Sequence, residues 1–300
     1  MDNEKNTAMD KLGTTVSDIC ANAIKKSLDN KNDTDFVGED GHRYCGVCKK
    51  AKTITSPFGD GEEVGIPCDC IKSENAAKED ARKRNKHRIM VERLRREGLS
   101  DAAYGNNTFE NDETPNCQAS QIARYYVDEW ENQKERGQGI IFYGNCGTGK
   151  TFYATCIANA LIEQGKSVYV TNFPRLMSYT PDQMRNVDYM LNACDLVVID
   201  DLGVENPNAY NFSRVNDVVD RRYASGLPII VTTNLDISEL ELTTPTNDRE
   251  RKLNRIYDRI LEMCPMRVAA VGESRRREKA RRARAEEAVK FKEWQKKQNI

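Results

Sequence analysis

A glycine-rich stretch, GNCGTGKT at residues 144–151, constrains this chain more than any other feature. A short apolar run with the length of a buried strand precedes it, and residues with helical spacing follow it. Glycines in such a loop let consecutive backbone N–H groups hold a phosphate at a helix N-terminus, where the helix dipole also favours anions. An ordinary glycine-rich turn is the alternative, but it needs neither the strand nor the helix. The predicted nucleotide-binding residues are Gly144, Asn145, Cys146, Gly147, Thr148, Gly149, Lys150 and Thr151.

Three of the expected roles in this site involve a phosphate or Mg²⁺ directly. In loops of this form the lysine, here Lys150, reaches the β- and γ-phosphates. The threonine hydroxyl, here of Thr151, ligates Mg²⁺. Asp200 ends the apolar run Leu196–Ile199, and a carboxylate at the end of a buried strand is costly unless it meets a metal or water. We therefore predict that Asp200 holds the Mg²⁺ shell.

Two more polar residues follow strand-like runs and are candidates for catalysis. Asp201 is expected to orient the attacking water. It is one methylene shorter than the glutamate that hydrolytic phosphate-loop enzymes often carry there, so we expect slow hydrolysis. Asn234 follows the run Ile229–Thr232 and is expected to touch the γ-phosphate or its water. Asparagine is also a common turn residue, so this role depends on the residues around it.

Apolar runs alternate with helical segments through the second half of the chain. Alternating strands and helices predict an α/β domain, with a parallel sheet covered by helices on both faces. Before the first run, Ile122, Tyr126 and Trp130 lie one helical turn apart and predict a helix that covers the start of this domain. The expected strands are Ile140–Tyr143, Val168–Val170, Leu196–Ile199, Ile229–Thr232 and Val268–Val271.

Two close pairs of cysteines precede this domain, separated by a segment rich in glycine and proline. Four thiolates can converge tetrahedrally on Zn²⁺, and a metal would stabilise a segment that has too few apolar residues for a core of its own. The second pair has the spacing C-x-C instead of the commoner C-x-x-C, so His42 or His87 could replace one thiol as a ligand. The same cysteines could instead form a disulfide pair or remain as unliganded thiols. The predicted zinc ligands are Cys45, Cys48, Cys68 and Cys70.

Composition and charge restrict the compartment and the partners. The 300 residues carry 46 basic and 47 acidic side chains, with a mean hydropathy of −0.73. No apolar run approaches the roughly 18 residues of a membrane helix, and Met1–Asp10 has no signal-peptide core. Isolated cysteines such as Cys156 and Cys194 are expected to be reduced. These features predict a cytoplasmic protein without a membrane partner, in which any nucleic-acid contact comes from local basic patches.

Three helical segments have two interpretations each. Residues 72–98 are basic and polar nearly all round, which suits a solvated connecting helix or one that binds phosphates. The tail from Ser274 is a basic helix that later carries Phe291 and Trp294, and it is either a solvated extension or a nucleic-acid contact. Residues 15–24 have helical spacing and either pack on the next module or dock a partner.

A row of arginines lies on one expected helix. Arg251, Arg255 and Arg259 are spaced by four, and like charges at this spacing repel, so the row suits a position opposite an anion. The row could supply an arginine finger to a neighbouring subunit's ATP. A solvated arginine face is the alternative.

These observations divide the chain into four parts. Residues 1–98 form the N-terminal helix, the zinc-binding module and the basic helix, and residues 99–116 form a linker. Residues 117–273 form the nucleotide-binding domain, and residues 274–300 form the basic helical tail.

The motifs resemble, in this order, those of the DnaC/DnaI/IstB-like AAA+ ATPases, over roughly Thr108 to Arg276. The cysteine segment is similar to the zinc-binding N-terminal part of helicase loaders from Gram-positive bacteria and their phages. The resemblance implies a P-loop AAA+ (ASCE) fold, with Asn234 as a sensor, Arg259 as the arginine finger with Arg255 beside it, and Arg276 as a second sensor. The stretches that carry it are Gly144–Thr151, Val198–Gly203, Asp220–Tyr223, Pro228–Leu235, Arg255–Arg259 and Gly272–Arg276.

The resemblance also implies a function. It points to an ATP-dependent loader of a hexameric DnaB-type replicative helicase, with ATP, Mg²⁺ and Zn²⁺ as cofactors. Single-stranded DNA and further copies of the AAA+ domain would be its partners as well, and ATP hydrolysis would be slow and regulatory. An IstB-type transposition helper is a second interpretation, although such proteins generally lack a cysteine module. A zinc-stabilised nucleic-acid-binding adaptor that does not turn over ATP is a third.

Overall fold

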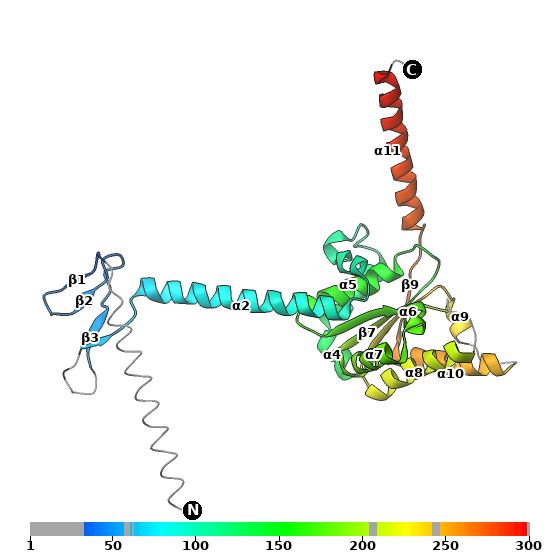
Figure 1. Ribbon diagram of the computed structural model, residues 1–300, viewed down its shortest axis with the longest axis horizontal. Helices are drawn as coiled ribbons and strands as arrows, with labels where there is room; N and C mark the ends of the chain where they lie inside the picture. Colours follow the sequence, from blue (N-terminus) through cyan, green and yellow to red (C-terminus); the bar gives the residue numbers. More distant parts are fainter. Residues whose placement is uncertain (1–32, 57–60, 62, 204–208, 242–246, 299–300) are drawn as a thin grey trace, which may run out of the picture. The chain divides into compact units, whose positions relative to one another are not determined.

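The chain divides into two compact units, residues 1–86 and residues 87–300 (Figure 1). The computed structural model describes residues 33–56, 61, 63–203, 209–241 and 247–298, so the helix expected at residues 15–24 lies outside the described residues. No helix within these ranges is both long enough and apolar enough to cross a membrane.

The first unit contains short antiparallel pairs and the start of a long helix. Its described strands are β1 (Phe36–Val37) with β2 (Arg43–Tyr44), and β3 (Thr53–Thr55) with β4 (Glu63–Gly65). Helix α2 (Asp69–Gly98) begins here and ends in the second unit. Its surface is almost wholly exposed and is lined with oppositely charged side chains four residues apart, such as Glu74 and Lys78 at 2.6 Å. Such pairs stabilise an exposed helix modestly.

The second unit is built on a parallel sheet, as the sequence predicts. Among the described residues it has five strands in the order β6-β7-β8-β5-β9, and every neighbouring pair is parallel. The last strand begins two residues before the expected Val268. The strands are β5 (Ile140–Tyr143), β6 (Val168–Asn172), β7 (Leu196–Leu202), β8 (Ile229–Thr233) and β9 (Met266–Ala269).

Helices cover both faces of this sheet, as expected. In Figure 1, α5 lies on one side of the strands, and α7, α8 and α10 lie on the other. Successive residues of a strand point to opposite faces, so Ile140 and Phe142 face α3 and α5, whereas Ile141 joins the opposite core. The helices are α3 (Gln118–Asp128), α4 (Trp130–Glu135), α5 (Lys150–Glu163), α6 (Phe173–Ser178), α7 (Pro181–Ala193), α8 (Ala209–Ser225), α9 (Ile237–Leu240), α10 (Asp248–Met263) and α11 (Arg275–Lys297), with 3₁₀ turns η1 (Ala102–Asn106) and η2 (Phe109–Asn111).

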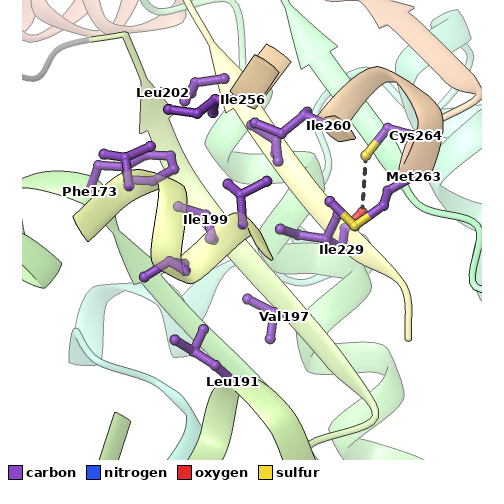
Figure 2. Close-up of a cluster of buried hydrophobic side chains, with 14 of the residues drawn as sticks. Phe173, Leu191, Val197, Ile199, Leu202, Ile229, Ile256, Ile260, Met263 and Cys264 are labelled. Atoms are coloured by element: carbon purple, nitrogen blue, oxygen red, sulfur yellow. Dashed lines mark hydrogen bonds between the residues drawn. The ribbon is translucent and has the colours of Figure 1, made fainter. Parts of the chain in front are cut away.

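Helix α10, which carries the arginine row, buries one apolar face. Ile256 and Ile260 are buried against strands β7 and β8, and the Cys264 thiol donates to the backbone oxygen of Ile229 at 3.4 Å (Figure 2). On the opposite face of the sheet, Tyr126 and Trp130 are buried, as the helical spacing of these aromatic residues predicts.

The charged side chain of Arg222 lies wholly inside the second unit. Arg222 of α8 has an exposed fraction of 0%, and its guanidinium donates to backbone oxygens of Leu191, Cys194, Asp195 and Pro228 at 2.7–3.1 Å. It therefore holds the end of α7 and the approaches to two central strands. Without it these carbonyl groups would lose their hydrogen-bond donor.

We predict that Arg222→Leu lowers the free energy of unfolding by about 3 kcal/mol or more, because buried acceptors are left without donors. Its neighbour Arg221 is a matched control, since its pair with Asp188 at 3.5 Å is partly exposed and is worth at most about 1 kcal/mol. Guanidinium unfolding followed by circular dichroism compares the two variants. Equal losses in both would show that Arg222 has no special structural role.

Candidate nucleotide-binding site and cysteine cluster

The glycine-rich loop connects β5 to α5, and its backbone explains the choice of glycine. The φ angles of Gly144, Gly147 and Gly149 are 124°, 84° and 102°. Residues with a β-carbon rarely adopt such positive φ angles. Gly149 is the N-cap of α5, and no described side chain caps this helix. The first N–H groups of α5 therefore remain available to an anion at the positive end of the helix dipole.

Lys150 is 5% exposed and lies at the centre of the loop. Its Nζ donates to the backbone oxygens of Gly144 at 2.7 Å and Asn145 at 2.8 Å, and to Asn234 Oδ1 at 2.8 Å. Burial lowers the pKa of Lys150 below its ordinary value, because desolvation disfavours the ammonium ion. The structure thus brings together the loop lysine and the residue that the sequence proposed as a sensor.

Asp200, at the carboxyl end of β7, meets the first turn of α5. Thr151 Oγ1 donates to Asp200 Oδ1 at 2.8 Å, and the Thr232 hydroxyl donates to the same oxygen. Burial raises the pKa of Asp200, whose exposed fraction is 6%. A hydroxyl and a carboxylate side by side are the oxygen donors that Mg²⁺ prefers, so Thr151 and Asp200 fit the predicted Mg²⁺ site.

Asp201 follows in an unusual backbone conformation. Its φ of 60° is rare for a residue other than glycine, and its N–H donates to Thr232 Oγ1 at 3.0 Å. The pairing of β7 with β8 shifts register between Ile199 and Leu202, as in a β-bulge. Bulges redirect side chains near functional sites, and here the Asp201 side chain lines the same cavity as Lys150.

The loop opens on a cavity of about 420 Å³. The predicted residues Lys150, Thr151, Asp201, Asn234 and Arg276 line it together. Three further lining residues, Asn107, Phe152 and Arg275, were not predicted as site residues. Arg275 lies next to Arg276 in a run of three arginines, which was the one sequence signal for it.

Asn107 comes from the segment that the sequence indicates is a linker. Its side-chain amide donates to Thr155 Oγ1 at 2.8 Å. Asn159 of α5 in turn donates to the backbone oxygens of Tyr104 and Asn107, both at 2.8 Å. This segment is therefore held against the phosphate-loop helix and forms one wall of the cavity.

Arg259 lies elsewhere. Its guanidinium forms an ion pair with Asp220 of α8 and lies 5.9 Å from the ring centre of Tyr223. Among the described residues that line the cavity, Arg259 is absent. The structure thus separates it from Lys150 of its own chain, and Arg255 beside it is exposed.

The four cysteines of the first unit come together. The sulfur atoms of Cys45, Cys48, Cys68 and Cys70 all lie within 4.8 Å of one another. A tetrahedral Zn²⁺ with Zn–S bonds of about 2.3 Å places its sulfurs about 3.8 Å apart, within this limit. Backbone N–H groups of Lys50 and Cys70 lower the pKa of Cys48 to about 6, whereas the hydrogen bond with Cys48 raises the pKa of Cys70 to about 12. The donor set therefore suits zinc.

Nearly all of α2 and most of the second unit have known relatives. Residues 72–283 match the family described as IstB-like ATP binding protein. The chain is 32% identical over 218 residues to the replicative helicase loader DnaC of Escherichia coli (strain K12), covering 68% of this chain and 86% of that protein. It is 31% identical over 159 residues to the replicative helicase loader DnaI of Bacillus subtilis (strain 168), covering 48% and 50% respectively.

The fold has a counterpart among solved structures. A crystal structure of DnaI superposes with a TM-score of 0.50 at 21% identity, covering 60% of this chain and 99% of that one. The parallel sheet among helices is thus AAA+-like, which confirms the predicted fold, and the family match identifies this domain as ATP-binding.

We predict that the purified protein carries one zinc ion per chain and that Cys68→Ser removes most of it, because three thiolates and one weak hydroxyl hold Zn²⁺ poorly. Mass-spectrometric metal analysis measures the zinc content. Cys156→Ala, on α5 in the other unit, is the control and should keep its zinc. Equal zinc content in both variants would contradict the cluster as the binding site.

Proposed function

Since this chain belongs to the family of IstB-like ATP-binding proteins, we propose that it is an ATP-dependent loader of a hexameric DnaB-type replicative helicase, with slow, regulatory hydrolysis. One observation carries this proposal. Lys150 donates a hydrogen bond to Asn234, and Thr151, the next residue in the first turn of α5, donates one to Asp200, so these residues meet at one site. This site lies in a chain that is similar to proteins named replicative helicase loaders.

The residues around the cavity suit ATP with Mg²⁺. The loop N–H groups and Lys150 would bind the phosphates, with Lys150 exchanging its carbonyl and Asn234 partners for phosphate oxygens. Thr151 and Asp200 would hold Mg²⁺, which neutralises charge on the β- and γ-phosphates. Asp201 and Asn234 would orient the attacking water. The short Asp201 side chain, in a fixed backbone conformation, is consistent with slow hydrolysis.

Arg259 would act on the ATP of a neighbouring subunit. Its guanidinium is paired with Asp220 of its own chain, a partner that a triphosphate could replace. Such a residue couples hydrolysis to self-association, because a site is complete only when a second copy supplies the guanidinium.

The first unit is the proposed helicase-binding part. Several large apolar side chains among its described residues are exposed to solvent. Exposed apolar side chains can contribute to a protein-interaction surface. The exposed residues are Phe36, Val37, Val47 and Ile54.

Helix α11 supports contact with single-stranded DNA. No residue of this described helix is buried, and its basic side chains outnumber the acidic ones. Phe291 and Trp294 are about half exposed and stack on each other with ring centres 5.9 Å apart. Basic side chains attract the phosphate backbone, and exposed aromatic rings stack with unpaired bases. A transposition helper would share these features. The two functions are therefore distinguished by the protein that this chain binds, a helicase or a transposase.

We predict that the protein co-purifies with a DnaB-type helicase and that the affinity between the two proteins changes when Mg-ATP is added. Lys150→Ala should abolish the effect of ATP while leaving zinc content intact, because the phosphate loop and the cysteine cluster belong to different units. Pull-downs with and without ATP, together with metal analysis, measure both properties. Binding to a transposase in place of a helicase would overturn the loader proposal, and loss of zinc in Lys150→Ala would refute the division into two modules.

We predict that Arg259→Ala lowers steady-state ATP hydrolysis by at least about tenfold, because arginine fingers contribute large rate factors. Arg251→Ala is the control on the same helix, since Arg251 is exposed and paired with Asp248 at 3.0 Å. Mixing Lys150→Ala with Arg259→Ala protein should restore part of the activity, because the first supplies the guanidinium and the second an intact site. A phosphate-release assay that shows no recovery on mixing would exclude action between subunits.

A further inference from the structure

The first turn of α11 lies directly on the phosphate loop. The N–H of Arg275 donates to the backbone oxygen of Gly147 at 2.9 Å. A β-carbon at Gly147 would lie 2.1 Å from Ser274 Oγ, and one at Gly149 would lie 3.1 Å from the guanidinium carbon of Arg275. Glycine at these two loop positions thus allows the start of α11 to approach.

The Arg275 side chain joins three segments that are distant in sequence. Its guanidinium donates to the hydroxyl of Tyr153 on α5 and to the hydroxyl of Thr114 in the segment before α3. It also lies 5.0 Å from the ring centre of Tyr153 and 5.4 Å from that of Phe152. Cations over aromatic rings are attracted to the ring face, and the attraction grows where water is excluded.

The partners of Arg275 are themselves fixed. Tyr153 is buried, and its hydroxyl lies 2.9 Å from Thr114 Oγ1 and 3.0 Å from Cys117 Sγ. The carboxylate of Asp112, shielded from solvent, lies 4.0 Å from the guanidinium. Arg275 therefore enters a preformed polar site beside the cavity.

Little else holds α11 in place. Within the described helix no residue is buried, so α11 has no apolar core contact of its own. The attachment of α11 therefore depends on its first turn. Arg276, which follows Arg275 in this turn, lines the nucleotide cavity. Any change in how this turn is held moves Arg276 relative to the phosphates.

We propose that Arg275 is a positioning residue: it joins the first turn of α11 to Tyr153 and Thr114, and thereby holds Arg276 at the nucleotide cavity. This role rests on the proposed ATP-binding function. Arg275 also lines the cavity, but its Nη2 group donates to the two hydroxyls, and the role assigned to it is to act through Arg276. Lysine cannot replace it, because an ammonium group is not planar and cannot stack on the two rings while it donates to both hydroxyls.

The test is a double-mutant cycle on the full chain, using Arg275→Ala, Arg276→Ala and the variant with both changes. Titration with a fluorescent ATP analogue and with ADP, both in Mg²⁺, measures affinity, and thermal unfolding reports the state of the fold. We expect Arg275→Ala to weaken ATP binding on the order of tenfold. Because one residue acts through the other, the double variant should bind ATP no more weakly than Arg276→Ala alone.

Three further variants separate positioning from a general loss of structure. Tyr153→Phe keeps the ring and removes the hydroxyl that accepts from Arg275, so it should weaken ATP binding less than Arg275→Ala does. Arg275→Lys should not restore binding. Arg136→Ala, which removes the same charge from an exposed site at the end of α4, should bind ATP like the unaltered protein.

The outcomes distinguish this role from the proposed function. If the unaltered protein does not bind ATP, the proposed function fails and the role of Arg275 fails with it. If it binds ATP but the losses from Arg275→Ala and Arg276→Ala add, or if Arg275→Lys binds normally, only the positioning role is overturned. If Arg275→Ala unfolds, an unchanged ATP affinity in Tyr153→Phe overturns the role, and a weakened affinity at normal thermal stability supports it.

Discussion

Burial of opposite charges at one edge of the sheet is the constraint on which this structure depends. Lys150 and Asp200 are both almost inaccessible to water, and an isolated buried charge is strongly unfavourable. Each is satisfied by polar groups from neighbouring elements, Lys150 by Asn234 and Asp200 by Thr151 and Thr232. These partners meet because the carboxyl ends of parallel strands lie at the same edge, where α/β proteins bind ligands.

The rest of the second unit holds the strands in place, so that their carboxyl ends stay together at that edge. Apolar cores on both faces fix the strands, and Arg222 fixes the backbone at the start of β7 and β8, opposite to the site. The segment containing Asn107 and the first turn of α11 then close around the loop. The first unit brings four thiols together, and the metal proposed to bind them would stabilise it in place of an apolar core. Two independent sources of stability let the units be tested separately.

The sequence by itself determined whatever is encoded locally. Glycines at positive φ define the phosphate loop, apolar runs of strand length define the sheet, and cysteine spacing defines the cluster. Each of these patterns reports a short-range requirement of the backbone or of a ligand, so it can be recognised without knowing what lies across the fold. Helix α10 is similar, because its buried face follows from helical spacing.

Only the tertiary structure decided which distant side chains meet. Arg275 and Thr114 are 161 positions apart in the sequence, Arg259 and Asp220 are 39 apart, and no periodicity links either pair. Arg275 belongs to a basic tail for which a solvated extension is one interpretation, yet it completes the wall of the cavity, and Arg222 is a charged residue that is fully buried. A charged side chain can lie inside a protein only where the fold supplies partners for it, and those partners come from elements that the local sequence does not specify.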